Sequence, residues 1–252
     1  MEKNKKFLGY KNIVLHIPHS SRLFPKHSAH SFDLLDDEEK KLIDFYTDEL
    51  FIPQGKDDRI KSVVFPYCRL YCDVERLCND PLEREGLGIS YGRWAYKGNH
   101  TTIYRSLGKS LDAYRDYLNF HSDMAMILAE DLTTPLLIDC HSFSSLPNLL
   151  NKTSSDIDIC IGYNEDETRP DLVVMGNIKN HFQNLGYKVG INNPFSNSKT
   201  FNVPGLYQYH SVMIEVNKRL YMNEFSIEKN DRFEKIKTDI QSLYNNLLYP
   251  VK

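Results

Sequence analysis

Residues 134–140 read TPLLIDC, an apolar run that begins beside Pro135 and leads into a polar cluster. A strand that is covered on both faces loses the alternation of apolar and polar side chains and becomes apolar throughout. We therefore predict that this run is a central strand of a sheet, with helices packed on both sides of it.

Short runs rich in β-branched residues alternate with longer amphipathic stretches on either side of this strand. This alternation is typical of an α/β sandwich. No repeat, low-complexity tract or linker interrupts the chain, so we interpret residues 1–252 as one domain. Further strands are predicted at residues 12–17, 62–65, 70–74, 157–161, 188–191 and 212–216, and helices at residues 36–51, 109–130, 172–185 and 232–248.

The composition excludes several classes of protein. The 252 residues carry a formal net charge of only −3, which gives no electrostatic reason to expect nucleic acid or an anionic membrane as partner. No stretch approaches the roughly 18 apolar residues of a membrane-spanning helix, and the N-terminus lacks the apolar core of a signal peptide. The five cysteines form no C-x-x-C pair, so reduced thiols and a cytoplasmic location are expected.

Ionisable residues occur at three predicted strands, and open α/β sheets bind ligands beyond the carboxyl ends of their strands. His19 lies in HIPHSS (residues 16–21) and His141 in IDCHSF (residues 138–143). Glu215 lies within VMIEVNKR, where it shares the facing of Met213. Each has an ordinary explanation, because a lone histidine at a strand end is more often structural and a lone strand glutamate mostly faces solvent.

Taken together, these residues favour a metal centre. Two histidines and one carboxylate can be the protein ligands of a catalytic Zn²⁺, and Glu215 can serve as the general base. The acidic ligand stays open between Asp44 and Asp48, which lie at i and i+4 of the first predicted helix and hence on one face. We expect His16 to lie behind the ligands or in the core, and Asp139 to orient a ligand histidine.

The segment CRLYCDVER (residues 68–76) indicates how a charged substrate could be bound. Arginine suits bidentate recognition of a carboxylate, and a neighbouring aspartate can hold its guanidinium in place. Arg69, Asp73 and Arg76 supply these groups. An internal Arg–Asp ion pair that only braces the fold explains each of these residues equally well.

Over about residues 12–225 the chain resembles the N-formylglutamate amidohydrolases, a family similar in fold and metal chemistry to zinc carboxypeptidases and aspartoacylases. Seven segments match in the order of the family: HIPHSS, IDFYTDELF, CRLYCDVER, YLNFH, LLIDCHSF, IGYNEDE and MIEVNKRLYM. The resemblance implies a three-layer α/β sandwich with a mixed central sheet, of the phosphorylase/hydrolase-like kind.

The resemblance also implies roles for individual residues. It places His19, Asp44 and His141 on Zn²⁺ or another divalent cation, and thus favours Asp44 over Asp48. Glu215 becomes the general base and later the acid that protonates the leaving amine, while Arg69 joins it in catalysis. The residues assigned to substrate binding are Arg76, Asp73, Ser142 and Asn164.

The expected activity is hydrolysis of a small N-acyl amino acid such as N-formylglutamate. Alternatives are another N-acyl amino acid, a short peptide, or a non-catalytic binding protein on the same fold. The chain departs from the family at residues 192–201 (NNPFSNSKTF), where a Gly-rich stretch is usual, and at Glu75, where Asn is frequent. Residues 192–207 are expected to form a loop that closes over the substrate.

Overall fold

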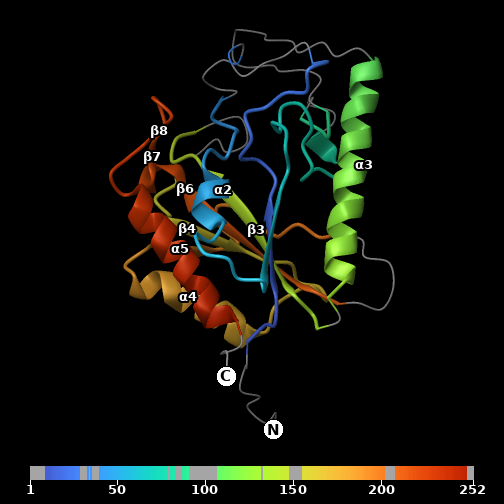
Figure 1. The fold of residues 1–252 in the computed structure, drawn as a ribbon. Coiled ribbons are helices and arrows are strands. Elements are labelled where there is room, and N and C mark those ends of the chain that lie inside the picture. Colours follow the sequence, from blue (N-terminus) through green and yellow to red (C-terminus); the bar gives the residue numbers. More distant parts are fainter. Residues whose placement is uncertain are drawn as a thin grey trace.

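The structure is a computed structural model that describes residues 9–28, 33, 35, 40–78, 80–82, 87–90, 107–131, 133–147, 155–201 and 208–248. Its framework is a six-stranded sheet with the order β2-β1-β3-β6-β4-β5 (Figure 1). The strands are β1 (Ile13–Ile17), β2 (Ile60–Val64), β3 (Leu136–Phe143), β4 (Ile159–Gly162), β5 (Val189–Ile191) and β6 (His210–Asn217).

The sheet is mixed, as predicted. Strands β2, β1, β3 and β6 run parallel, β4 pairs antiparallel with β6, and β5 runs parallel to β4. The register sets His16 opposite Asp139 and His141 opposite Glu215. Because paired residues of neighbouring strands project to the same face, and i and i+2 share a face, these four polar side chains lie on one side of the sheet.

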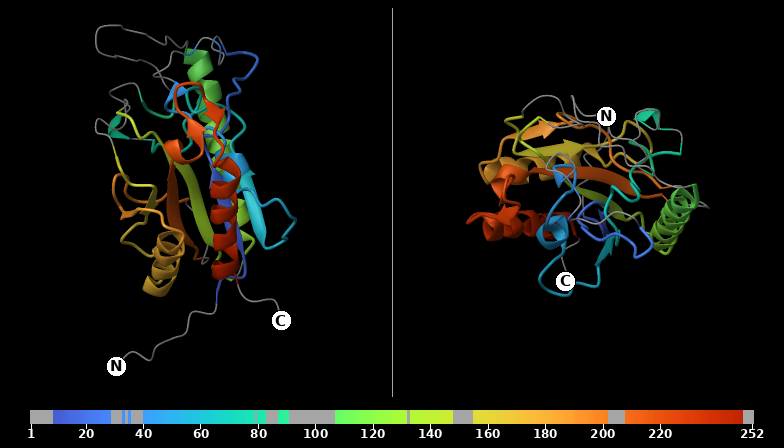
Figure 2. Two further views of the ribbon diagram at one scale, coloured as in Figure 1. Left: turned by 90° about the vertical axis from the view of Figure 1, so that its left-hand side faces the viewer. Right: turned by 90° about the horizontal axis from the view of Figure 1, so that it is seen from above.

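Helices cover both faces and complete the sandwich. On one face of the sheet, Leu15, Ile138 and Ile214 share an apolar core with three helices, α2 (Thr47–Phe51), α4 (Leu172–Asn184) and α5 (Phe233–Leu247). On the other face, Val14 and Leu137 share a core with α3 (Leu107–Ala129). The view from above in Figure 2 shows α4 and α5 together, apart from α3.

After β6 the chain forms a short 3-10 helix, η3 (Lys218–Leu220), and a small hairpin of β7 (Met222–Asn223) and β8 (Glu228–Lys229) that the sequence pattern did not predict. The other predicted elements are confirmed with small shifts at their ends, except in two segments. Within the described residues no helix is both long and apolar enough to cross a bilayer.

The predicted helix over residues 36–51 is wrong in its middle part. Residues 36–39 lie outside the described residues and residue 40 is helical, but residues 41–46 form turns and irregular backbone, and the helix resumes only at Thr47–Phe51. Tyr46 has a φ of 66°, the Asp44 amide donates to the His19 carbonyl over 3.0 Å, and the Thr47 hydroxyl donates to the Asp44 carbonyl over 2.8 Å. These bonds compete with helical ones, so Asp44 and Asp48 do not share a helix face.

The predicted strand over residues 70–74 is also wrong, because this segment is a series of turns. The Tyr71 and Cys72 amides both donate back to the Cys68 carbonyl, over 2.9 and 3.3 Å. Most of its side chains are apolar because the segment reaches two cores: Leu70 packs in one, whereas Tyr71 and Val74 pack in the other. Tertiary packing therefore produced a pattern that resembles a strand.

Candidate metal centre and its cavity

Three buried side chains from distant parts of the chain converge near the carboxyl end of β1 and β3. His19 follows β1, Asp44 precedes α2, and His141 lies within β3. The Nδ1 atoms of His19 and His141 lie 3.4 and 3.1 Å from Asp44 Oδ2. One ligand atom from each residue lies within 4.8 Å of the other two, so the three could hold one metal ion. This is the trio that the sequence and the resemblance singled out.

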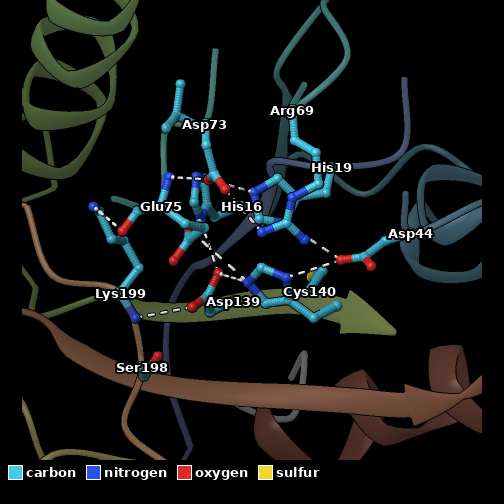
Figure 3. Close-up of polar contacts among 12 residues, drawn as sticks. His16, His19, Asp44, Arg69, Asp73, Glu75, Asp139, Cys140, Ser198 and Lys199 are labelled. Carbon is cyan, nitrogen blue, oxygen red and sulfur yellow. Dashed lines mark hydrogen bonds and ion pairs between the residues drawn. The ribbon is translucent and has the colours of Figure 1, made fainter. Parts of the chain in front are cut away.

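A buried carboxylate fixes the outer nitrogen of each imidazole (Figure 3). His19 Nε2 donates to Asp73 Oδ1 over 2.8 Å, and His141 Nε2 donates to Asp139 Oδ1 over 2.9 Å. Because these carboxylates hold Nε2, the Nδ1 atom of each ring is directed at Asp44 and is the nitrogen that could bind a cation, the arrangement usual for metal-bound histidines. His19 Nδ1 is buried and makes no hydrogen bond to any described residue, as is expected of a nitrogen that binds a cation.

The charges of the cluster also fit a cation. Burial by itself would raise the pKa of Asp44, but the neighbouring imidazoles of His141 and His19 outweigh it and lower the pKa below its usual range. Burial would lower the pKa of His141, yet Asp139 and Asp44 raise it well above its ordinary value. The site thus attracts positive charge, and a metal ion binds such ligands by displacing a proton.

Glu215 projects from β6 beside His141 and is 8% exposed. Its Oε2 atom is buried and accepts no hydrogen bond from the described residues. Burial, with a smaller contribution from Asp44 and Asp139, raises the pKa of Glu215 to about 8 against the opposing effect of His141 and Lys218. This carboxyl group can therefore take up or release a proton near neutral pH.

A cavity of about 290 Å³ opens over the cluster, a size suited to a small molecule. Arg69, Arg76 and Ser142 are among the residues that line it. Asp73 lies behind this wall, where its Oδ2 accepts from Arg69 Nη2 over 2.8 Å and lies 3.4 Å from Arg76 Nε. Asp73 therefore orients both guanidinium groups and His19, rather than facing the cavity.

Asn164 is not among the residues that line the cavity. Its amide group bonds the backbone of Ser198 in both directions: Nδ2 donates to the Ser198 carbonyl over 3.0 Å, and Oδ1 accepts from the Ser198 amide over 3.3 Å. Asn164 thereby fixes the loop that brings Phe195 and Ser196 to the cavity wall. Of the predicted loop over residues 192–207, residues 202–207 lie outside the described residues.

Sequence reasoning did not single out two buried lysines. Lys218 Nζ donates to the Lys41 and Ile43 carbonyls, both over 2.7 Å, and lies 4.0 Å from Asp44 Oδ1, so it holds the turn that carries Asp44. The Lys199 amide donates to Asp139 Oδ2 over 2.8 Å. A lysine in a polar stretch is ordinarily a surface residue, so the only signal for Lys218 was its place in a segment that matches the family.

His16 was expected either behind the cation ligands or in the core, and the structure places it behind His141. Its Nδ1 atom lies 2.9 Å from the same Asp139 oxygen that accepts from His141, and the residue is fully buried. Asp139 therefore joins two imidazoles. Burial would raise the pKa of Asp139, but His141 and His16 outweigh it and hold the pKa well below its ordinary value.

The model of a protein family described as N-formylglutamate amidohydrolase matches residues 11–222. The crystal structure of N-formylglutamate amidohydrolase from Ralstonia eutropha JMP134 superposes with a TM-score of 0.74 and 18% identity, covering 94% of this chain and 93% of that one. A gene product of Agrobacterium tumefaciens gives a TM-score of 0.63 and 16% identity, covering 95% and 91%. At these identities both show a shared fold. No curated protein sequence matches.

Proposed function

The chain belongs to the N-formylglutamate amidohydrolase family, and from this premise we propose that it hydrolyses the amide bond of a small N-acyl amino acid, such as N-formylglutamate, with the help of a divalent cation. The products would be a small acid and a free amino acid. Zn²⁺ is the first cation to test, because two imidazoles and one carboxylate form a ligand set of catalytic zinc. The five free cysteines support a cytoplasmic location.

The proposal depends on one observation above all. Two Nδ1 atoms and one carboxylate oxygen, from His19, His141 and Asp44, lie within 4.8 Å of one another at a cavity that also contains Glu215. Each histidine keeps a carboxylate on its other nitrogen. Metal-bound histidines almost always have such a partner on the nitrogen that does not bind the metal.

His19, Asp44 and His141 would hold the cation, which when bound supplies Lewis acidity that polarises a carbonyl and makes water nucleophilic near neutral pH. Glu215 would accept the proton of the attacking water and pass it to the leaving nitrogen. The pKa of about 8 belongs to the cation-free site. A nearby positive charge favours the carboxylate form, which is the form that a base requires.

The two arginines of the cavity would bind and orient the substrate. Their guanidinium groups suit a carboxylate or a developing oxyanion, and Asp73 fixes them before any substrate arrives. We propose Arg69, which also donates to the Leu42 carbonyl over 3.0 Å, for the reacting carbonyl and Arg76 for the substrate carboxylate. Ser142 contributes to the same wall.

The test is to strip the protein with a chelator, reload it with Zn²⁺, and measure bound zinc together with formate release from N-formylglutamate. We expect one equivalent of zinc and zinc-dependent turnover in the wild type, with both lost in His141→Ala. A panel of N-formyl amino acids, N-acetyl amino acids and dipeptides defines the substrate. Zinc binding without turnover of any of them would instead identify a binding protein on this fold.

A further inference from the structure

Glu75 brings a carboxylate to the cavity wall for which the mechanism above has no use. Its side chain is 17% exposed, and its Oε1 atom is buried without a hydrogen bond from any described residue. The backbone around it is fixed, because the Glu75 amide donates to Asp73 Oδ1 over 3.1 Å and its carbonyl accepts from Lys199 Nζ over 3.0 Å (Figure 3). The backbone that brings this side chain to the cavity wall is thus fixed.

The neighbouring imidazoles do not supply the missing donor. Oε1 of Glu75 lies 3.3 Å from His16 Nδ1 and 3.9 Å from His141 Nε2. Each ring nitrogen carries at most one proton, and Asp139 Oδ1 lies nearer to both, at 2.9 Å. Asp139 therefore takes both protons, and the Glu75 oxygen remains an acceptor without a donor.

A buried carboxylate oxygen without a donor costs free energy, and a ligand that brings a donor recovers it. A ligand that brings a second carboxylate adds repulsion instead. The position of Glu75 also limits which ligand group it meets. It lies on the Nε2 side of His141, whereas Asp44 lies on the Nδ1 side, so a substrate group that contacts Glu75 would be one remote from the proposed cation.

We propose that Glu75 determines specificity. It selects N-acyl amino acids that carry a hydrogen-bond donor in place of one of the two carboxylates of N-formylglutamate. The smallest donor group of this kind is a primary amide. The inference rests on the proposed function, since it names the substrate class of the same cavity. Arg76 then binds the one carboxylate that remains. Glu75 acts on substrate choice and takes no part in the chemical step.

The experiment compares three substrates of nearly equal size: N-formylglutamate, N-formylglutamine and the α-amide of N-formylglutamate. For the zinc-loaded wild type we expect kcat/KM to be at least about tenfold higher for one of the amides than for the dicarboxylate, as a hydrogen bond to a charged group allows. Glu75→Gln should reduce this ratio about tenfold, chiefly through KM. Glu130→Gln, which alters an exposed carboxylate 2.9 Å from Lys61, should leave the ratio unchanged.

Zinc content and melting temperature establish that Glu75→Gln is folded and loaded, and titration with glutamine and glutamate gives the same comparison for product binding. A wild type that prefers N-formylglutamate to both amides overturns the inference, even if the variant does not fold. So does a ratio that is the same in wild type and Glu75→Gln. If none of the three substrates is turned over and neither amino acid binds, the proposed function itself fails.

Discussion

The two faces of the central sheet are built from the same strands but differ in their chemistry. Along β3, Ile138 points into an apolar core that α2, α4 and α5 share, whereas Asp139 and His141 point to the face covered by α3. That second face is apolar at Leu137, near the start of the strand, polar at Asp139 and His141, and apolar again at Phe143. Stability and chemistry are therefore separated by facing rather than by position along the chain.

The energetic consequence is that the two faces should respond differently to substitution. Apolar burial stabilises a fold by roughly 25 cal/mol per Å², and a cavity left in such a core adds a further cost. Buried charges, in contrast, contribute little or even reduce stability unless all of their partners are present. Substitutions on the first face should lower the free energy of unfolding, and substitutions on the second should lower activity.

The largest effect is expected for Glu215→Gln on the polar face. Loss of a general base reduces kcat by about a thousandfold, within the usual range for such groups. Bound zinc should stay at one equivalent, and the free energy of unfolding should stay equal or rise, because a neutral amide avoids the cost of ionisation that raises the pKa of the buried carboxyl group. Steady-state kinetics, metal analysis and urea unfolding measure the three quantities. A kcat within tenfold of wild type would contradict the assigned role.

The neighbouring residue on the same strand gives the opposite pattern. Ile214 is fully buried on the apolar face, so Ile214→Ala should lower the free energy of unfolding by about 2–5 kcal/mol. At a temperature where the variant is folded, its kcat should match the wild type. Urea unfolding followed by circular dichroism, with kinetics on the same sample, makes the comparison. If kcat instead fell a hundredfold with stability intact, the separation of the two faces would be wrong.

Asp139→Asn tests a residue on the polar face that touches no substrate. The amide keeps the shape of the side chain but weakens the bond that orients His141. We expect the dissociation constant for Zn²⁺ to rise about 10–100-fold, as is usual for outer partners of metal-bound histidines. Competition with a zinc indicator measures it, and Ile214→Ala is the control that should keep wild-type affinity. Unchanged affinity in Asp139→Asn would argue against the assigned cation ligands.

The smallest expected effect is a pH dependence of stability that comes from His121, a residue between the polar site and the core under α3. Burial, Lys199 and His16 lower the pKa of His121 from 6.5 to about 4, while its bond to the Val74 carbonyl acts in the opposite sense. Between pH 6.5 and 4 the unfolded chain binds a proton at this residue and the folded protein does not. Stability is therefore lost as pH falls through this window, and none is lost above it.

His121→Gln keeps a donor for the Val74 carbonyl and removes the titrating group. The wild type should lose up to about 2 kcal/mol more stability than this variant between pH 6.5 and 4, a figure reduced for partial exposure of the ring. Urea unfolding at pH 7, 5.5 and 4.5 measures the difference. Parallel pH profiles for the two proteins would show that His121 does not contribute.

Much of this division was present in the sequence. The apolar run at residues 134–140 predicted a central strand, and a spacing of two residues put Asp139 and His141 on one face, because side chains alternate along any strand. The same rule gave Glu215 the facing of Met213. The matched segments added the identity of the acidic ligand candidate, Asp44, which helical periodicity alone had left equal to Asp48.

The tertiary structure decided how those faces meet. Local periodicity fixes facing within a strand but not the register between strands, so it could not set His141 opposite Glu215. Nor could it show that residues 41–46 turn, because the bond from the Asp44 amide to the His19 carbonyl is non-local. The unsatisfied oxygen of Glu75 likewise exists only once distant segments surround it. Local backbone geometry determines which face of a strand each side chain lies on, so the sequence is enough to predict it. Contacts between remote residues exist only in the folded chain.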